Sequence, residues 1–117
     1  MPDIAPASFY EASFDDFLKI DIRVGKIMLV ETLPKSKKLL KLQVDFGTFG
    51  GVRTILAGIA EHYLPESLLG LNVAAVVNLA PRTMFGIESH GMLLAGHNGD
   101  KVCLVTCPDV AVGERLG

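Results

Sequence analysis

Several features are scarce in this sequence of 117 residues, and each scarcity excludes a class of protein. Its apolar runs are short, as at 73–77, so we expect no segment that spans a bilayer. The first residues include neither a basic start nor an apolar stretch, so we expect no secretion signal. Charged residues make up only 21% and hydrophobic residues 50%, which is too apolar for a disordered chain. The composition therefore predicts one folded domain with a single core.

Cysteine is also rare, and the pattern of reactive side chains is sparse. Cys103 and Cys107 would lie about 13 Å apart on one strand, too far for a disulfide, which predicts free thiols and a cytoplasmic location. The histidines do not stand at metal-ligand spacing with one another or with a carboxylate, and no phosphate-binding glycine loop or nucleophile motif is present. We therefore expect no enzyme activity, no metal site and no cofactor. The three histidines are His62, His90 and His97.

The formal net charge of -2 does not by itself suggest a nucleic-acid partner, but the charges are unevenly distributed. The stretch 19–54 carries a net charge of +5, and the rest of the chain carries -7. A partner could therefore meet a positive surface on an acidic protein, or these lysines could simply be the solvated side of strands. The basic residues of this stretch are Lys19, Arg23, Lys26, Lys35, Lys37, Lys38, Lys41 and Arg53.

The pattern of apolar residues is mostly that of strands. Residues 1–12 contain two prolines and little periodicity and are predicted to form an N-terminal arm. Ser13 and Asp16 have the spacing of a capping box, which predicts a short helix immediately after Ser13. A helical turn is expected at 65–70, and a hairpin turn at Asn98-Gly99. Alternating or buried apolar residues predict strands at 20–29, 40–46, 52–57, 73–78, 92–95 and 102–106.

The predicted order of elements is three strands, a short helix and then further strands. The apolar phase of the first strand changes after Gly25, which predicts a bulge or sharp bend there. Small closed barrels need such bends to turn their corners. The sequence therefore predicts an all-β protein with short helices, a five-stranded OB-fold barrel with additional C-terminal strands.

The segment 78–95 holds the side chains best suited to binding. Asn78 ends an apolar strand, where its amide can cap a turn or meet a ligand. Arg82 offers a planar guanidinium, and Met84 and Phe85 follow it closely. An arginine beside a flat or polarizable side chain can hold a phosphate and stack on a base. The same apolar residues could instead be core or dimer contacts.

Five motifs in order make this sequence resemble the stand-alone tRNA-binding domain family, whose OB-fold module also forms the C-terminal part of many bacterial methionyl-tRNA synthetases. The resemblance covers 13–117, nearly the whole chain. The motifs are Asp21-Ile22-Arg23-Val24-Gly25, the run from Lys38 to Gly47, Ala57-Gly58-Ile59, Asn78-Leu79-Ala80-Pro81-Arg82 and Ser89-His90-Gly91-Met92.

The resemblance implies a homodimer that binds folded tRNA with little sequence preference and catalyses nothing. Pairing of the two subunits would use the N-terminal segment and the region after the barrel. Residues at matching positions are implied to contact the RNA, and Lys37 and Arg53 are added here for their charge. The predicted tRNA-binding residues are Lys37, Lys38, Lys41, Arg53, Asn78, Arg82, Ser89 and Met92.

Two positions depart from the usual family pattern. Ala57 stands where a serine is usual, and His90 stands where a glutamate is usual. A related branch, the CsaA-like export chaperones, is similar over the same barrel and holds unfolded peptides. The alternatives to an independent tRNA-binding protein are therefore a peptide-binding chaperone and the tRNA-binding appendage of an aminoacyl-tRNA synthetase. Under these alternatives, the partners are unfolded peptides or a synthetase.

Overall fold

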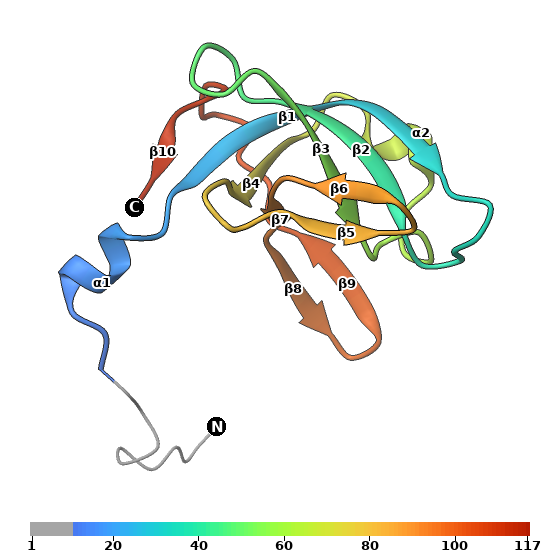
Figure 1. Ribbon diagram of the computed structural model, residues 1–117, viewed down its shortest axis with the longest axis horizontal. Coiled ribbons are helices and arrows are strands. Elements are labelled where there is room, and N and C mark those ends of the chain that lie inside the picture. The colour runs from blue at the N-terminus through green and yellow to red at the C-terminus, as the bar shows by residue number, and fades with distance from the viewer. Residues whose placement is uncertain (1–10) are drawn as a thin grey trace.

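The computed structural model describes residues 11–117, so most of the predicted arm 1–12 lies outside the described residues. Two short helices and ten strands follow one another along these residues (Figure 1). In chain order they are α1 (Phe14–Leu18), β1 (Ile22–Thr32), β2 (Leu40–Asp45), β3 (Val52–Ala57), α2 (Pro65–Leu68), β4 (Asn72–Val76), β5 (Arg82–Met84), β6 (Ile87–Ser89), β7 (Met92–Leu93), β8 (Ala95–Asn98), β9 (Lys101–Leu104) and β10 (Arg115–Leu116).

The main sheet has the strand order β3-β2-β1-β4-β7, with β10 paired to β1. Long β1 changes neighbours along its length, because Ile22–Lys26 pair with β4 and Lys26–Thr32 pair with β2. The sheet curls, and two hydrogen bonds join its edge strand β3 to the end of β6 and to the residue after it. The His90 N–H donates to the Thr54 carbonyl at 2.8 Å, and the Leu56 N–H donates to Ser89 Oγ at 3.0 Å. The all-β, OB-like fold expected from the sequence is confirmed.

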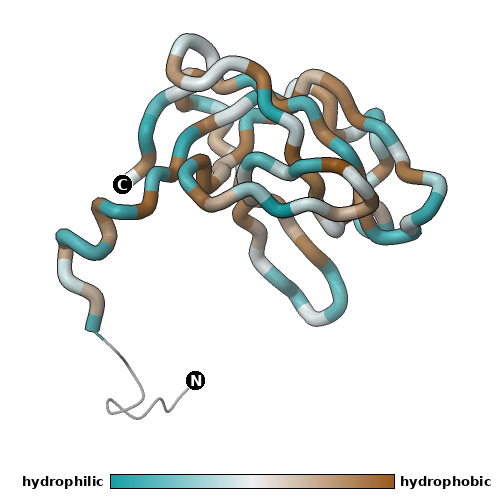
Figure 2. Tube along the Cα trace, in the orientation of Figure 1, coloured by the Kyte–Doolittle hydropathy of each residue, from teal (hydrophilic) through white to brown (hydrophobic). Residues whose placement is uncertain are grey.

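Alternation of hydrophobic and hydrophilic residues builds the core of the barrel (Figure 2). Along β2, Leu40, Leu42 and Val44 are buried, and the residues between them are half-buried. This period of two is what a sheet with one covered face requires. Residues of β1, β2, β3, β4, β9 and α2 meet in this core. The largest side chains that are fully buried there are Phe46, Ile27, Leu40, Leu42, Ile55 and Leu68.

Gly25 is needed for packing, and the irregularity expected there lies three residues further along. The register between β1 and β2 shifts between Ile27 and Leu29, which places the bulge at Met28. A Cβ at Gly25 would lie 2.5 Å from Val44 Cγ1 and 2.6 Å from Phe46 Cε1. The glycine therefore lets the buried side chains of Val44 and Phe46 approach the backbone of β1.

The C-terminal half of the barrel differs most from the sequence prediction. The segment 92–95 forms no single strand, because β7 pairs with β4 while β8 pairs with β9. Asn98 pairs with Lys101, so the turn of that hairpin is Gly99-Asp100, one residue later than expected. The hairpin β5–β6, expected as a loop, was missed because each of its strands has only three residues.

Candidate nucleic-acid interface

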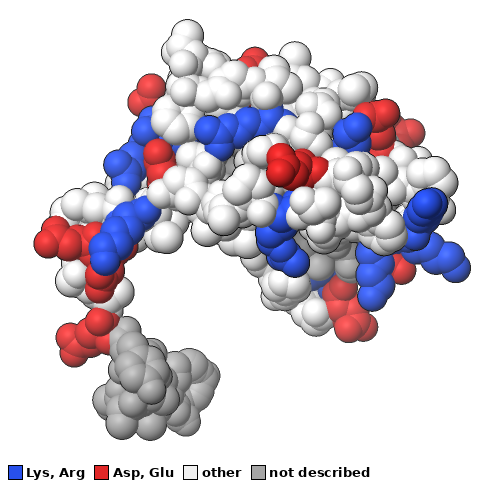
Figure 3. All heavy atoms as spheres, in the orientation of Figure 1, with Lys and Arg blue, Asp and Glu red and all other residues white. Residues whose placement is uncertain are grey.

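The loop between β1 and β2, residues 33–39, presents exposed lysines on a backbone that is fixed from within. Ser36 Oγ accepts hydrogen bonds from the N–H groups of Lys38, at 3.3 Å, and Leu39, at 3.1 Å. The Lys38 carbonyl accepts a hydrogen bond of 2.9 Å from the Ala60 N–H. The side chains of Lys35, Lys37 and Lys38 remain exposed, and basic groups gather over this loop at the right of Figure 3.

The hairpin β5–β6, which crosses the front of the barrel in Figure 1, contributes one more cation, Arg82. Arg82 is exposed and pairs with Ser89 across the hairpin. Arg82 and Met84 line a hollow of about 120 Å³, and Met92 forms part of its wall. A second hollow of about 220 Å³ shares Leu56 and Met92 with the first, so the two adjoin. Both walls are largely aliphatic.

The hairpin and the basic loop lie on the same end of the barrel. The contacts of Ser89 with Leu56 and of His90 with Thr54 make β6 antiparallel to β3. The tip of the hairpin therefore extends past Ala57, the last residue of β3. It points toward Ala60, whose N–H is hydrogen-bonded to the Lys38 carbonyl. We call this surface the hairpin face, and its members are Lys35, Lys37, Lys38, Arg82, Met84, Phe85 and Met92.

Among residues 11–117, no carboxylate forms a salt bridge with a cation of the hairpin face. Within residues 11–117, salt bridges involve other basic residues, among them Lys19, Arg23 and Arg115. Lys41, a predicted contact, belongs to that group, because its Nζ lies 3.8 Å from Glu31 Oε1 on the neighbouring strand. Unpaired, exposed cations are the ones available to an external anion.

Three of the predicted RNA contacts have their polar groups engaged inside the protein. Asn78 Oδ1 accepts from the Asp21 N–H at 2.9 Å, and its Nδ2 donates to the Lys19 carbonyl at 2.6 Å. Ser89 is buried, and its hydroxyl accepts from the Leu56 N–H and donates to the Gly91 carbonyl at 3.2 Å.

Arg53, the third of these residues, is half-buried between β4 and two aromatic rings. Its Nη1 donates to the Val77 carbonyl at 2.6 Å. Its guanidinium carbon lies 5.8 Å from the ring centre of Phe46 and 5.9 Å from that of Phe49. The structure thus brings Lys37, Lys38, Arg82 and Met92 onto the hairpin face, whereas Arg53, Asn78 and Ser89 hold strands together.

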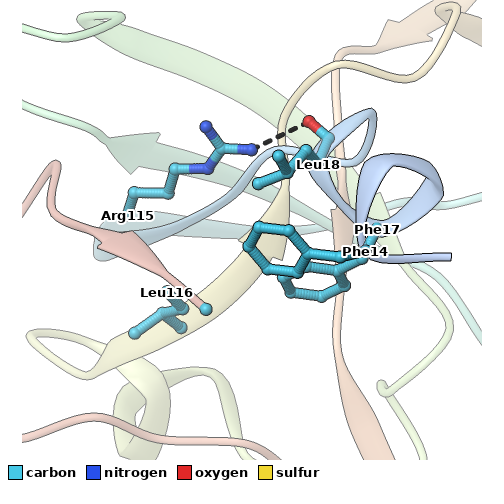
Figure 4. A pocket seen from close by; sticks show the side chains of 6 residues that line it. Phe14, Phe17, Leu18, Arg115 and Leu116 are labelled. Atoms are coloured by element: carbon cyan, nitrogen blue, oxygen red, sulfur yellow. Dashed lines mark hydrogen bonds between the residues drawn. The ribbon is translucent and has the colours of Figure 1, made fainter.

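A separate apolar surface surrounds α1. Ser13 and Asp16 form the expected capping box, yet no residue of this helix is buried. Phe14 is 72% exposed, and its ring stacks on Phe17 with 6.5 Å between ring centres. Both rings border a hollow of about 260 Å³ that Leu116 closes on the other side (Figure 4). Arg115 Nη2 donates to the Leu18 carbonyl at 3.0 Å, which holds the helix beside β10.

Among residues 11–117, no three His, Cys, Asp or Glu side chains gather where they could hold a metal ion. Both cysteines are free thiols, with Cys103 exposed and Cys107 half-buried. In the same part of the chain, neither helix has the length or the apolar run needed to traverse a bilayer.

Comparison with known proteins decides the family. The family model described as "Putative tRNA binding domain" matches residues 22–115. The chain belongs to this tRNA-binding domain family. A methionine–tRNA ligase of Porphyromonas gingivalis is 45% identical over 108 residues, which are 91% of this chain and 16% of the ligase. The chain thus spans about a sixth of the length of the curated relatives it resembles.

Two crystal structures share the fold of this tRNA-binding domain over almost their whole length. The MetRS related protein from Pyrococcus horikoshii superposes with a TM-score of 0.86 at 40% identity, covering 93% of this chain and 100% of that protein. The CsaA chaperone from Picrophilus torridus superposes with a TM-score of 0.85 at 31% identity, covering 92% and 100%. The domain is therefore related to both a synthetase-related protein and a chaperone.

The two departures from the family pattern have different surroundings in this tRNA-binding domain. Ala57 is 9% exposed, packs in the core and also lines the hollow of about 220 Å³, so the hydroxyl that serine would carry is missing from the wall of that hollow. His90 Nε2 lies 3.0 Å from Glu88 Oε1 on β6. The histidine thus has a carboxylate beside it on the same hairpin.

Proposed function

We propose that this tRNA-binding domain binds folded tRNA with little sequence preference, acts as a homodimer and catalyses no reaction itself. The carrying observation is the hairpin face, where Lys35, Lys37, Lys38 and Arg82 are exposed and form no salt bridge with any carboxylate of residues 11–117. Such cations neutralise phosphates and release counterions, a contribution that does not depend on sequence. The proposed setting is the cytoplasm, and the proposed partners are tRNA and an aminoacyl-tRNA synthetase.

Shape recognition follows from the kind of groups on this face. Lysines act as mobile point charges, and the two hollows that adjoin at Met92 are largely aliphatic. Folded RNA is read through phosphates, 2′-hydroxyls and unstacked bases rather than through paired base edges. A face that combines mobile cations with apolar hollows suits a folded RNA more than a particular sequence.

The homodimer is supported by the apolar surface around α1. Phe14, Phe17 and Leu18 are exposed beside Leu116, and covering them with a second copy would remove this apolar area from water. We expect light scattering to give twice the chain mass of 12.6 kDa. Phe14→Asp with Phe17→Asp should give the monomer mass, whereas Leu64→Asp, at an exposed position outside this surface, should not.

The test of tRNA binding is a salt titration. Lys37→Ala with Lys38→Ala should weaken binding and lower the slope of log K against log salt concentration by about 2 for each subunit that engages the RNA. Lys101→Ala is the control, since this exposed lysine borders the turn of the β8–β9 hairpin, which extends away from the hairpin face (Figure 1). Salt-independent binding by the unchanged protein, or an unaltered slope in the double variant, would refute the proposal.

A second candidate function is the binding of unfolded peptides, favoured by the aliphatic hollows around Met92 and by the likeness to the CsaA chaperone. Apolar binding of this kind depends little on salt. Titration of unfolded peptide against the protein would distinguish the two functions, because Met92→Asp should abolish peptide binding, whereas Lys37→Ala with Lys38→Ala should leave it intact. The synthetase partnership is tested by adding the domain to an aminoacyl-tRNA synthetase that has no such domain of its own and measuring the aminoacylation rate, which should increase.

A further inference from the structure

Phe85 occupies a backbone conformation that its side chain opposes. Met84 pairs with Ile87, so Phe85 and Gly86 are the two central residues of the β5–β6 turn. Their φ angles are 52° and 76°, both in the left-handed region, as in a type I′ hairpin. Glycine, asparagine or aspartate normally occupies such positions, because a Cβ crowds the following carbonyl. Between residues 11 and 117, Phe85 is the one residue other than glycine with a positive φ.

Burial in the core does not offset this strain. The Phe85 side chain is 55% exposed at the end of the hairpin, and it is absent from the core. The aromatic contacts of the described residues are the Phe14–Phe17 stack and the arginines that lie over Phe46 and Phe49. A strained backbone at an aromatic residue that is more than half exposed is typical of a site that meets a partner.

The surroundings of Phe85 indicate which partner. Arg82 precedes it on β5, and the tip of the hairpin extends toward the exposed lysines of the 33–39 loop. A flat apolar ring among unpaired cations matches a nucleotide, whose base has an aromatic face and whose phosphate is anionic. An apolar peptide would use the ring but would leave the cations unpartnered.

We propose that Phe85 stacks on an unpaired nucleobase of the bound tRNA, while Lys37, Lys38 and Arg82 hold the flanking phosphates. This proposal rests on the proposed function. Single-stranded loops are where folded RNA presents splayed bases, and aromatic side chains receive them whatever their sequence. The stacking thus adds affinity without adding sequence preference.

The absence of tryptophan from the sequence gives a direct test. Phe85→Trp places the one tryptophan of the variant at the turn, and a base stacked on it should quench the tryptophan emission when tRNA saturates the protein. Val52→Trp is the control, because Val52 is 60% exposed and lies at the opposite end of β3 from Ala57. The emission of this control should stay unchanged. For both variants, a gel-mobility shift of labelled tRNA establishes that the protein is saturated.

Two further variants separate stacking from strain and from charge. Phe85→Ala should weaken tRNA binding about 5- to 150-fold with an unaltered salt slope, because the ring neutralises no phosphate. Phe85→Asn should weaken binding similarly and raise the melting temperature, since asparagine accepts the left-handed conformation. A fall in melting temperature would overturn the strain argument.

Unquenched emission from Trp at position 85 under saturating tRNA, or full affinity in Phe85→Ala, would overturn the stacking proposal while leaving tRNA binding intact. Quenching by unfolded peptide but not by tRNA would also overturn it. Failure of the unchanged protein to bind tRNA at low salt is a different result, which refutes the proposed function itself.

Discussion

Replacing Gly25 by alanine should destabilise the barrel through steric conflict in its core. The added methyl carbon would lie 2.5 Å from Val44 Cγ1 and 2.6 and 2.9 Å from two ring atoms of Phe46, and both of these side chains are fully buried. Overpacking of this kind costs about 1–3 kcal/mol of folding stability, and three such close contacts place the loss at about 3 kcal/mol. The entropy of unfolding of 117 residues is about 0.25 kcal/mol per kelvin, so the melting temperature should fall by about 12 °C.

Thermal unfolding followed by circular dichroism measures this shift, and Gly96→Ala is the matched control. Gly96 lies within a strand, and a Cβ there would meet no atom within 4 Å, so its melting temperature should change by no more than about 2 °C. Adding Val44→Ala to Gly25→Ala removes the nearest colliding atom, so the double variant should lose less stability than the sum of the single losses. A melting temperature for Gly25→Ala within about 2 °C of the unchanged protein would refute the packing argument.

Two further predictions concern residues around the start of the barrel. Asn78→Ala removes two hydrogen bonds to the segment before β1 and should cost about 1–2 kcal/mol, or about 4–8 °C, with the tRNA affinity of the folded protein unchanged. A loss of affinity with an unaltered melting temperature would contradict this structural role and would support the predicted RNA contact at Asn78. The hydrogen bond from the Ser13 backbone N–H, with further ones from the Lys19 and Ser13 side chains, lowers the pKa of Asp16 below its usual value. Because the folded-state pKa is the lower one, the contribution of this carboxylate to helix capping is complete above the unfolded-state pKa of about 3.9 and is lost as the pH falls through the folded-state value. NMR titration of the α1 amides should show this loss, and Asp16→Asn should abolish the titration; an Asp16 carboxyl that titrates above about 3.9 would contradict the capping geometry.

The strands predicted best are those whose sequence pattern is dictated by the core. The segment 52–57 was predicted with its observed bounds and 40–46 to within one residue, because alternation there reflects one buried face. The hairpin β5–β6 was missed because its strands are short and its turn begins with a phenylalanine instead of the usual asparagine or glycine. A sequence pattern cannot reveal a turn whose residues are not the ones that usually form such a turn.

The part of the candidate site that could be predicted from the sequence consists of charged residues, because a charged side chain in a loop is usually exposed. The lysines of the 33–39 loop are exposed, as a run of charge in a loop suggests. Asn78 and Ser89 were assigned to binding from motifs, but their hydrogen-bond partners lie 57 and 33 residues away in the chain. Such partners become neighbours only when the barrel closes, so sequence spacing could not reveal them. Lys35 was left out although it belongs to the same loop, and the charge of the loop as a whole was the signal that could have included it.

The pairing of β10 with the beginning of β1 has a consequence for how this barrel combines with other proteins. Ile22 lies opposite Leu116, so the two ends of the barrel leave it side by side (Figure 1). A module with adjoining ends can be inserted into a surface loop of a host protein, or circularly permuted by a short linker, without opening its sheet. The barrel can thus be transferred from one protein to another, by gene fusion or by design, as an intact domain.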